Sequence, residues 1–148
     1  MKKIVFIAFI LIATACSTTK TVTTDMVDKN KTLAIPEGKA IVYFVRPSMV
    51  GTIVPFKVSC NDSLIGSTTG KKYLFVVLDP NTYKFISEAE NDAELELQVE
   101  PDSKYYIEQK PKMGLIMARN ELSLLDNAEG EQKLAKCSIS SKFSPPEF

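Results

Sequence analysis

Three cysteines carry the most readily named chemistry in this chain, and the first of them is Cys16. Lys2 and Lys3 open the chain, and residues 4–15 form an apolar run that ends in small residues directly before Cys16. A basic start, a short apolar run and small residues at the cleavage point are typical of a secretory signal. We therefore predict cleavage after Ala15, which would leave Cys16 as the first residue of the mature protein.

Residues 12–16, Ile-Ala-Thr-Ala-Cys, resemble a bacterial lipobox, in which the cysteine thiol receives a diacylglyceryl group and the freed amine is usually acylated too. The apolar run is shorter than the roughly 20 residues of a transmembrane helix, so it is predicted to be a signal and not a span. Ser17, in place of an aspartate, favours an outer-membrane lipoprotein that faces the periplasm. The protein is thus expected to attach to the membrane through its N-terminal lipid. The alternative is an ordinary secretory signal followed by a chance cysteine.

Once Cys16 is assigned to lipid, Cys60 and Cys137 remain as a pair. An even pair of cysteines in an oxidising compartment is a disulfide candidate. The alternative is that both are buried thiols that behave as small hydrophobic residues. Both interpretations stay open at the level of sequence.

The chain contains no histidine, which excludes catalytic sites built on Ser-His-Asp or Cys-His and metal sites that rely on imidazole. We predict no catalytic residues, no metal site and no cofactor. Removal of residues 1–15 takes away two lysines and no acid, which leaves 16 basic against 18 acidic side chains. Because binding to nucleic acid needs a strongly basic face, a nucleic-acid partner is not expected.

A candidate binding patch combines aromatic and basic residues near the middle of the second half of the chain. Such a patch could contact an anionic polymer or a protein partner, although ordinary packing of long side-chain stems would explain the same residues. Its members are Tyr105, Tyr106, Lys110, Lys112 and Arg119.

Acidic residues are dense between residues 88 and 102. Glu94, Glu96 and Glu100 share the outward face of an alternating strand, so a solvated surface is favoured over a calcium site. A carboxylate-only hydrolase is the remaining enzyme hypothesis, and it would need two acids that converge in a cleft. Arg46, at the end of a buried strand, is expected to pair with a carboxylate such as Glu108.

These residues are positioned by a predicted domain that spans residues 36–137. The signal covers residues 1–15, the lipidated cysteine and a flexible Ser/Thr/Lys-rich tether cover residues 16–35, and a loose tail covers residues 138–148. The domain shows short β-type runs separated by turn residues, such as the continuously apolar residues 40–45 and the alternating residues 93–99. We predict a mainly β fold, a compact antiparallel β-sandwich of about seven to eight strands. One short C-terminal helix is expected at about residues 131–137.

Several stretches between residues 38 and 137 resemble a bacterial family known as domain of unknown function 2846, which occurs in small lipoproteins. The resemblance implies a compact β-rich domain and brings no activity or catalytic residues. The matching stretches are residues 38–47 (Gly-Lys-Ala-Ile-Val-Tyr-Phe-Val-Arg-Pro), 56–58, 65–66, 105–106, 112–114, 118–119 and 134–137.

Together these features predict a lipid-anchored envelope lipoprotein with a non-enzymatic binding or structural domain. Its partner is expected to be another envelope component, most plausibly a protein. A glycan-binding or peptidoglycan-binding module is the alternative, and it would need an exposed aromatic platform. A predicted carboxylate hydrolase ranks last.

Overall fold

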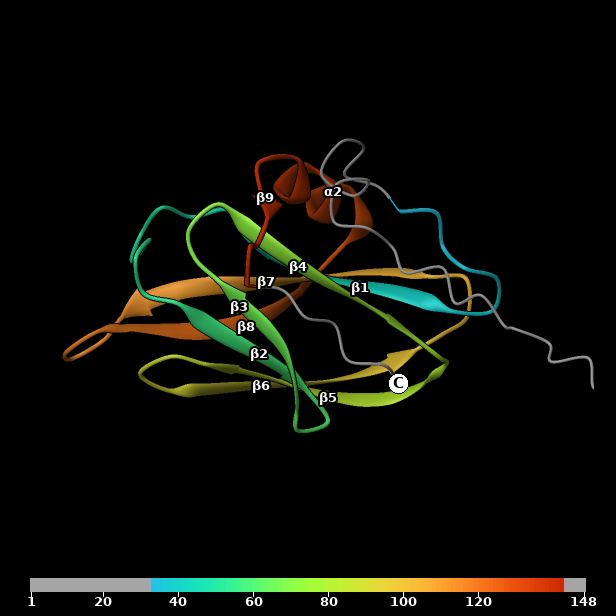
Figure 1. Cartoon of the computed structure of the whole chain (residues 1–148), viewed down its shortest axis with the longest axis horizontal. Coiled ribbons are helices and arrows are strands. Elements are labelled where there is room, and N and C mark those ends of the chain that lie inside the picture. The colour runs from blue at the N-terminus through green and yellow to red at the C-terminus, as the bar shows by residue number, and fades with distance from the viewer. Residues whose placement is uncertain (1–32, 143–148) are drawn as a thin grey trace, which may run out of the picture.

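The computed structural model describes residues 33–142, which fold into two β-sheets packed face to face with a helix on the outer side (Figure 1). The predicted signal, Cys16 and the tether up to residue 32 lie outside the described residues, and so do residues 143–148. Over the part described, the predicted mainly β sandwich with one short helix near its C-terminal end is confirmed.

The larger sheet has the strand order β8-β7-β1-β4-β9, and the smaller sheet has the order β3-β2-β5-β6. The strands of the larger sheet are β1 (Ala40–Arg46), β4 (Lys72–Leu78), β7 (Lys104–Met113), β8 (Ala118–Leu125) and β9 (Ser138–Ile139). The strands of the smaller sheet are β2 (Phe56–Cys60), β3 (Ser63–Thr68), β5 (Asn81–Glu88) and β6 (Asp92–Val99).

Nine strands are described, against the seven to eight predicted, and the pairing is mixed where it was expected to be antiparallel throughout. The pairs β1–β7 and β4–β9 are parallel. β9 has only two residues, which is too short to give an alternating pattern in the sequence. β1 and β7 are far apart along the chain, so a long crossover connection makes their parallel pairing accessible.

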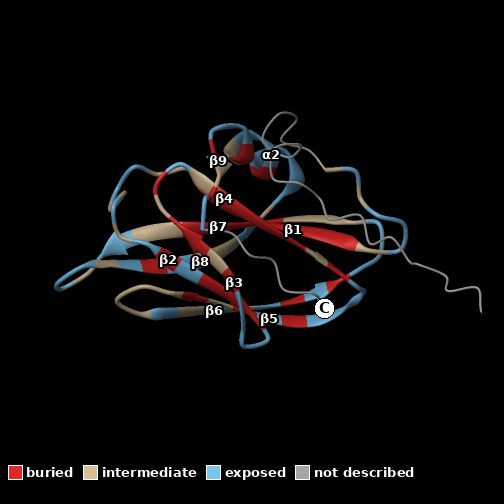
Figure 2. Cartoon of the chain, viewed as in Figure 1, coloured by how far each residue is buried: buried red, intermediate tan, exposed pale blue. Residues whose placement is uncertain are grey.

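β1 lies at the centre of the larger sheet, and all seven of its residues are buried (Figure 2). Side chains alternate between the two faces of a strand, so Val42 and Phe44 point into the space between the sheets while Tyr43 and Val45 point to the other side. The molecule therefore has two hydrophobic cores. We call them the inner core, between the sheets, and the outer core, between the larger sheet and the helix.

The outer core is built on a stack of two tyrosines. The rings of Tyr43 and Tyr106 lie 5.3 Å apart and nearly parallel, with 10° between their planes. The helix α2 (Asn127–Ala135) packs over them and buries Leu134. Gly130 faces Tyr106 so closely that an added Cβ would lie 2.2 Å from the ring atom Cγ. Only glycine permits this approach of the helix.

α2 begins four residues earlier than the predicted start at residue 131. Asp126 caps it, because its carboxylate accepts a hydrogen bond of 2.8 Å from the backbone N–H of Glu129. Lys133 then donates to the buried carboxylate of Glu108 at 2.6 Å and ties the helix to β7. Burial alone would lower the pKa of Lys133, but its hydrogen bonds to Glu108 and Glu129 outweigh that and raise it.

The packed domain extends past both predicted boundaries. Leu33 and Ile35, from the end of the predicted tether, pack against the outer core. The predicted tail was to begin at residue 138, but Ser138 pairs with β4 and the buried Ser140 donates to the carbonyl of Ser67 at 2.6 Å. Residues 138–142 thus belong to the domain, held by backbone bonds that side-chain patterns do not reveal.

Candidate functional site

The aromatic half of the predicted binding patch is not exposed. Tyr106 is buried in the outer core, where burial first, then Glu131 and Tyr43, raise its pKa to about 12. Tyr105 points to the opposite side of the larger sheet, packs against the inner core and accepts a hydrogen bond from the N–H of Glu100. The structure therefore separates the two tyrosines and gives no aromatic platform of the kind that the glycan-binding alternative needs.

The basic half of the patch lies near the β7–β8 hairpin. Lys112 and Arg119 are directly opposite each other in the ladder, and the Lys112 ammonium lies 3.1 Å from the carboxylate of Glu121. The ammonium of Lys110 lies 3.3 Å from the hydroxyl of Ser123. These cations thus flank the end of the hairpin.

Cys60 and Cys137 are thiols in two different cores. Cys60 belongs to the inner core and Cys137 to the outer core, so the larger sheet stands between them. A disulfide needs Cα atoms within about 7 Å of each other. The structure does not bring the pair together. Both cysteines are free, buried thiols in it. Burial raises the pKa of the Cys60 thiol to about 12.

Arg46 is fully buried, and the expected pairing with Glu108 is wrong. Glu108 is engaged by Lys133, as described above. Arg46 instead lies over the ring of Phe56, 3.6 Å from its centroid, and donates to backbone carbonyls. Its burial lowers the pKa of the guanidinium to about 10, so it remains charged at neutral pH. Carbonyl oxygens and an aromatic face take the place of the carboxylate.

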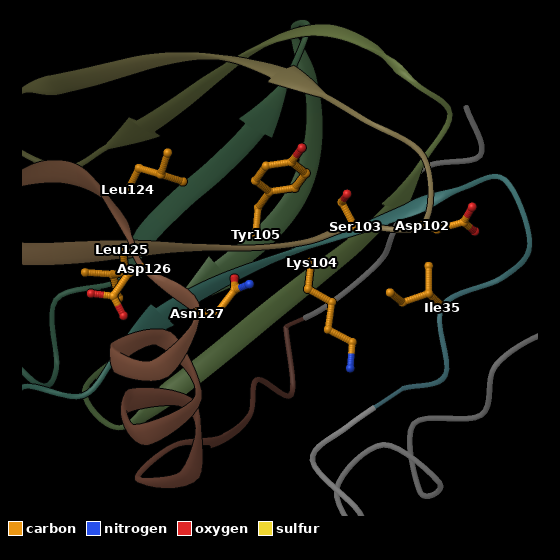
Figure 3. Close-up of a pocket in the computed structure, with 9 residues that line it drawn as sticks. All are labelled: Ile35, Asp102, Ser103, Lys104, Tyr105, Leu124, Leu125, Asp126 and Asn127. Atoms are coloured by element: carbon orange, nitrogen blue, oxygen red, sulfur yellow. The ribbon is translucent and has the colours of Figure 1, made fainter.

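One cavity of about 690 Å³ contains two acids, Asp102 and Asp126, at the end of β7. Asp126 is the helix cap, and Asp102 accepts a hydrogen bond of 3.0 Å from the N–H of Gly38. Figure 3 shows these two side chains on opposite sides of the view, while Tyr105 and Lys104 leave the ribbon in opposite directions. The lining residues surround the sheet end and do not converge on one point.

A second surface is more unusual, because large apolar side chains project into solvent from the loops at one end of the sandwich. Nine exposed large hydrophobic residues occur among residues 33–142. Seven of them belong to the β1–β2 loop or to residues 113–117 at the tip of the β7–β8 hairpin. Four are about nine-tenths exposed: Ile53 at 89%, Met113 at 92%, Leu115 at 93% and Ile116 at 91%. We call this surface the apolar end. It consists of Met49, Val50, Ile53, Met113, Leu115, Ile116 and Met117.

The two loops of the apolar end lie side by side. Gly51 approaches β8 so closely that an added Cβ would be 3.0 Å from the Cβ of Ala118. A small cavity of about 220 Å³ is lined by Val54 and Pro55 of one loop and Met117 of the other. In Figure 1 both loops and the β5–β6 turn lie at the left, and the segment that leads into β1 lies at the right. The apolar end is therefore opposite the point where the chain enters the domain.

Arg46 organises the β1–β2 loop from inside. Its guanidinium donates to the carbonyls of Gly51 and Val54, both at 2.7 Å, and to that of Val50 at 3.4 Å. Gly51 has a φ of +61°, a backbone conformation that is unfavourable for residues other than glycine. The N–H of Gly70 donates to the carbonyl of Thr52 at 3.3 Å. A charged, buried donor thus holds the loop that exposes Ile53.

Glu90 organises the β7–β8 hairpin from the β5–β6 turn. Its carboxylate accepts hydrogen bonds from three consecutive backbone N–H groups, those of Leu115 (2.8 Å), Ile116 (2.9 Å) and Met117 (2.6 Å). The bonds from Met117, Leu115 and Ile116 lower the pKa of Glu90, so the carboxylate is ionised at neutral pH. Gly114 leaves room for it, because an added Cβ would be 2.6 Å from the Oε2 atom. An anion thus fixes the hairpin tip.

A network of polar side chains lies behind the apolar end. Asn91 bonds both backbone groups of Asn120, accepting from the N–H at 2.7 Å and donating to the carbonyl at 2.9 Å. The Asn120 side chain donates to the carbonyl of Ser87, whose hydroxyl bonds the buried Gln109 at 2.7 Å. Gln109 continues to Thr68 at 2.6 Å. The usual arrangement is inverted here, with polar groups inside and apolar groups outside.

The candidate binding patch proposed from the sequence includes the three basic residues beside this surface. It does not include the apolar residues that form the surface. The apolar residues 113–117 follow Lys110 and Lys112 and precede Arg119. A run of large apolar residues around a glycine, bracketed by cations, was the available signal. Apolar runs usually indicate core, so only the structure shows that this one is exposed.

Within residues 33–142, no group of three or more cysteine, aspartate or glutamate side chains is arranged to hold a metal ion. Within the same residues, no helix is long and apolar enough to cross a membrane.

The family model of a "Protein of unknown function (DUF2846)" matches residues 36–121. Over 131 residues, the chain is 22% identical to a protein of Haemophilus influenzae described as "Uncharacterized protein", an alignment that covers 87% of this chain and 78% of the relative. No solved structure matches the chain. These comparisons identify the family of the domain and assign it no function. The role of the domain is therefore argued from the geometry of its surface.

Proposed function

The chain belongs to the DUF2846 family, which carries no assigned activity, and we propose that it is a lipid-anchored envelope lipoprotein whose β-sandwich is a non-catalytic binding module. The apolar end is its contact surface. The observation that carries this proposal is the exposure of seven large apolar side chains on two adjacent, internally braced loops.

Exposed apolar side chains gathered at one place mark interaction sites more often than isolated ones do. Binding costs free energy when loops must be ordered, and that cost falls when they are ordered beforehand. Arg46 and Glu90 provide such ordering, one through carbonyls and the other through N–H groups. A contact made by these loops would thus lose little conformational entropy.

The argument for binding over catalysis has two parts. The whole sequence lacks histidine, which removes the commonest general base. The two acids at the cavity of about 690 Å³, Asp102 and Asp126, already accept hydrogen bonds from backbone N–H groups. A carboxylate hydrolase would need both acids directed at one substrate atom, so it is the weaker proposal.

The anchor is tested by replacing Cys16 with serine. We expect the wild-type protein wholly in the membrane fraction and a larger soluble share of the Cys16→Ser protein, because the lipid chains are lost. Separation of inner and outer membranes by density then tests the proposed outer-membrane address. Absence of acyl chains from the N-terminal peptide of the wild-type protein, measured by mass spectrometry, would contradict the anchor.

The binding role is tested with a photoreactive amino acid placed at single positions in intact cells. We expect adducts from Ile53 and Ile116, which protrude from the two loops of the apolar end. Leu64 is the control, because it is 56% exposed but lies on β3, away from these loops. Equal adduct yields at all three positions, or none at any, would remove the proposed contact surface. The expected envelope protein partner stays a prediction.

A further inference from the structure

Resting on this proposed function, we infer that the apolar end binds a lipid bilayer by inserting its two loops between the headgroups. The partner surface is a bilayer that contains anionic phospholipid. Three features of the described residues argue for a fluid apolar phase as the partner, in preference to a protein.

The first feature is the shape of the surface. The most exposed side chains, Ile53, Leu115 and Ile116, stand on loop tips and are about nine-tenths exposed. None of the three is among the residues that line the cavity of about 220 Å³ at this end. A protein partner would need separate pockets for each tip, whereas acyl chains rearrange around any protruding shape. Leu is among the apolar side chains that interfacial segments bury at the boundary between headgroups and acyl chains.

The second feature is the backbone of the loops. Irregular backbone is tolerated at membrane depth only when its polar groups are bonded within the protein. In the hairpin, Glu90 accepts the N–H groups of three consecutive residues at the tip. In the other loop, five carbonyls accept hydrogen bonds from Arg46, the Thr52 hydroxyl or the N–H of Gly70. They belong to Met49, Val50, Gly51, Thr52 and Val54.

The third feature is the position of the cations. Lys112 and Arg119 face each other just behind the apolar hairpin tip, with Lys110 two pairs further along β7 on the same side as Lys112. With the tip among the acyl chains, these side chains would lie at the depth of the phosphates, where long basic side chains extend toward the headgroups. Their pairing with Glu121 and Glu108 reduces the net charge, so headgroup attraction is secondary to apolar insertion.

The test uses the purified Cys16→Ser protein that comprises residues 16–148. It carries no lipid, so no lipid contributes to binding. Flotation with phosphatidylethanolamine–phosphatidylglycerol vesicles measures the bound fraction against lipid concentration. We expect the double variant Leu115→Ser/Ile116→Ser to bind at least about tenfold more weakly, because two apolar side chains no longer enter the bilayer. The matched variant Leu64→Ser should bind as its parent does. Far-UV circular dichroism checks that each variant is folded.

A second set of vesicles distinguishes insertion from headgroup attraction. Phosphatidylcholine alone should still bind the Cys16→Ser protein, only a few-fold more weakly. Arg119→Gln should weaken binding to the anionic vesicles by up to about fivefold and leave binding to phosphatidylcholine unchanged. Binding that vanishes without anionic lipid, or that Leu115→Ser/Ile116→Ser does not alter, would overturn the insertion.

Adducts from photoreactive residue 116 in cells separate this inference from the proposed function. A lipid adduct together with vesicle binding supports both. A protein adduct without vesicle binding leaves the binding module in place and overturns the lipid surface. The absence of any adduct and of vesicle binding overturns both.

Discussion

At the scale of single residues, two opposite charges organise the apolar end. Arg46 is buried and donates to carbonyls, and Glu90 is half-buried and accepts from N–H groups. Each charge meets the group left unpaired where its loop departs from regular strand pairing. Charge-assisted hydrogen bonds are stronger than neutral ones. Exposed apolar side chains are thereby carried on backbone that does not depend on their own packing.

Replacing Glu90 with glutamine should loosen the hairpin tip. The amide oxygen can still accept, but the negative charge that favours three N–H donors is lost. We expect the N–H groups of Leu115, Ile116 and Met117 to exchange with solvent on the order of tenfold faster, measured by NMR. Glu94→Gln, on the exposed face of β6, is the matched control and should leave that exchange unchanged.

The same bonds define a pH dependence. Because the pKa of Glu90 is lowered in the folded protein, its contribution is present above the ordinary glutamate pKa and is lost as the pH falls through the lowered value. Exchange protection at the tip, corrected for the intrinsic rate, should therefore persist through mildly acidic pH and fall only below the ordinary glutamate range. Loss of protection already near neutral pH would contradict a carboxylate clamp.

Residue partners proved the hardest feature to predict. The sequence indicated that Arg46 is buried and needs compensation, and burial is what the structure has. The compensating group could not be predicted, because carbonyls of the following loop are invisible in side-chain patterns. Glu90 was likewise one of many acids between residues 88 and 102, and nothing local distinguishes it from its solvated neighbours.

At the scale of elements, strands with a simple environment were predicted and contacts between distant segments were not. The continuous apolar run of β1 and the alternation of β6 follow directly from burial on two faces and on one face. The start of α2 depends on the Asp126 cap, and the residues after it contain Gly130, which has low helix propensity. The glycine is retained by packing, since it admits the ring of Tyr106.

Replacing Gly130 with alanine tests the docking of α2. In an exposed helix this change stabilises by roughly 1 kcal/mol. Here the added Cβ overlaps the ring of Tyr106, so the free energy of unfolding should fall by about 2 kcal/mol, within the range of overpacked cores. Urea denaturation measures it. Glu131→Ala, at an exposed neighbouring position, should change stability by less than about 0.5 kcal/mol. A stabilised Gly130→Ala protein would refute the close approach.

At the scale of the whole molecule, three layers divide the apolar residues into an inner and an outer core. Cys60 lies in the first and Cys137 in the second, with the larger sheet between them. Both thiols are buried, as the second of the two interpretations open at the level of sequence requires. Which core each belongs to depends on the packing of α2, and this long-range arrangement leaves no mark in the spacing of the two residues.

Thiol alkylation without reductant tests the two-core arrangement. In the folded protein, both cysteines should resist iodoacetamide at pH 8, because they are buried and the raised pKa of Cys60 keeps its thiol protonated. After unfolding in urea, both should react, which mass spectrometry detects as two added groups. Alkylation that requires prior reduction would instead show a disulfide and contradict the placement of the cysteines in separate cores.

The chain enters the domain at the end opposite the apolar end, and this sets its reach. In the proposed lipoprotein, residues 16–32 would span at most about 60 Å when fully extended, and the ten residues of β7 add about 34 Å of domain length. An anchored molecule standing upright would therefore carry its loops up to about 95 Å from the lipidated cysteine. With the tether folded back, the apolar end of the same molecule would face the bilayer that holds its anchor. Tether length would therefore decide whether the protein bridges two membrane surfaces or contacts one surface at both of its ends.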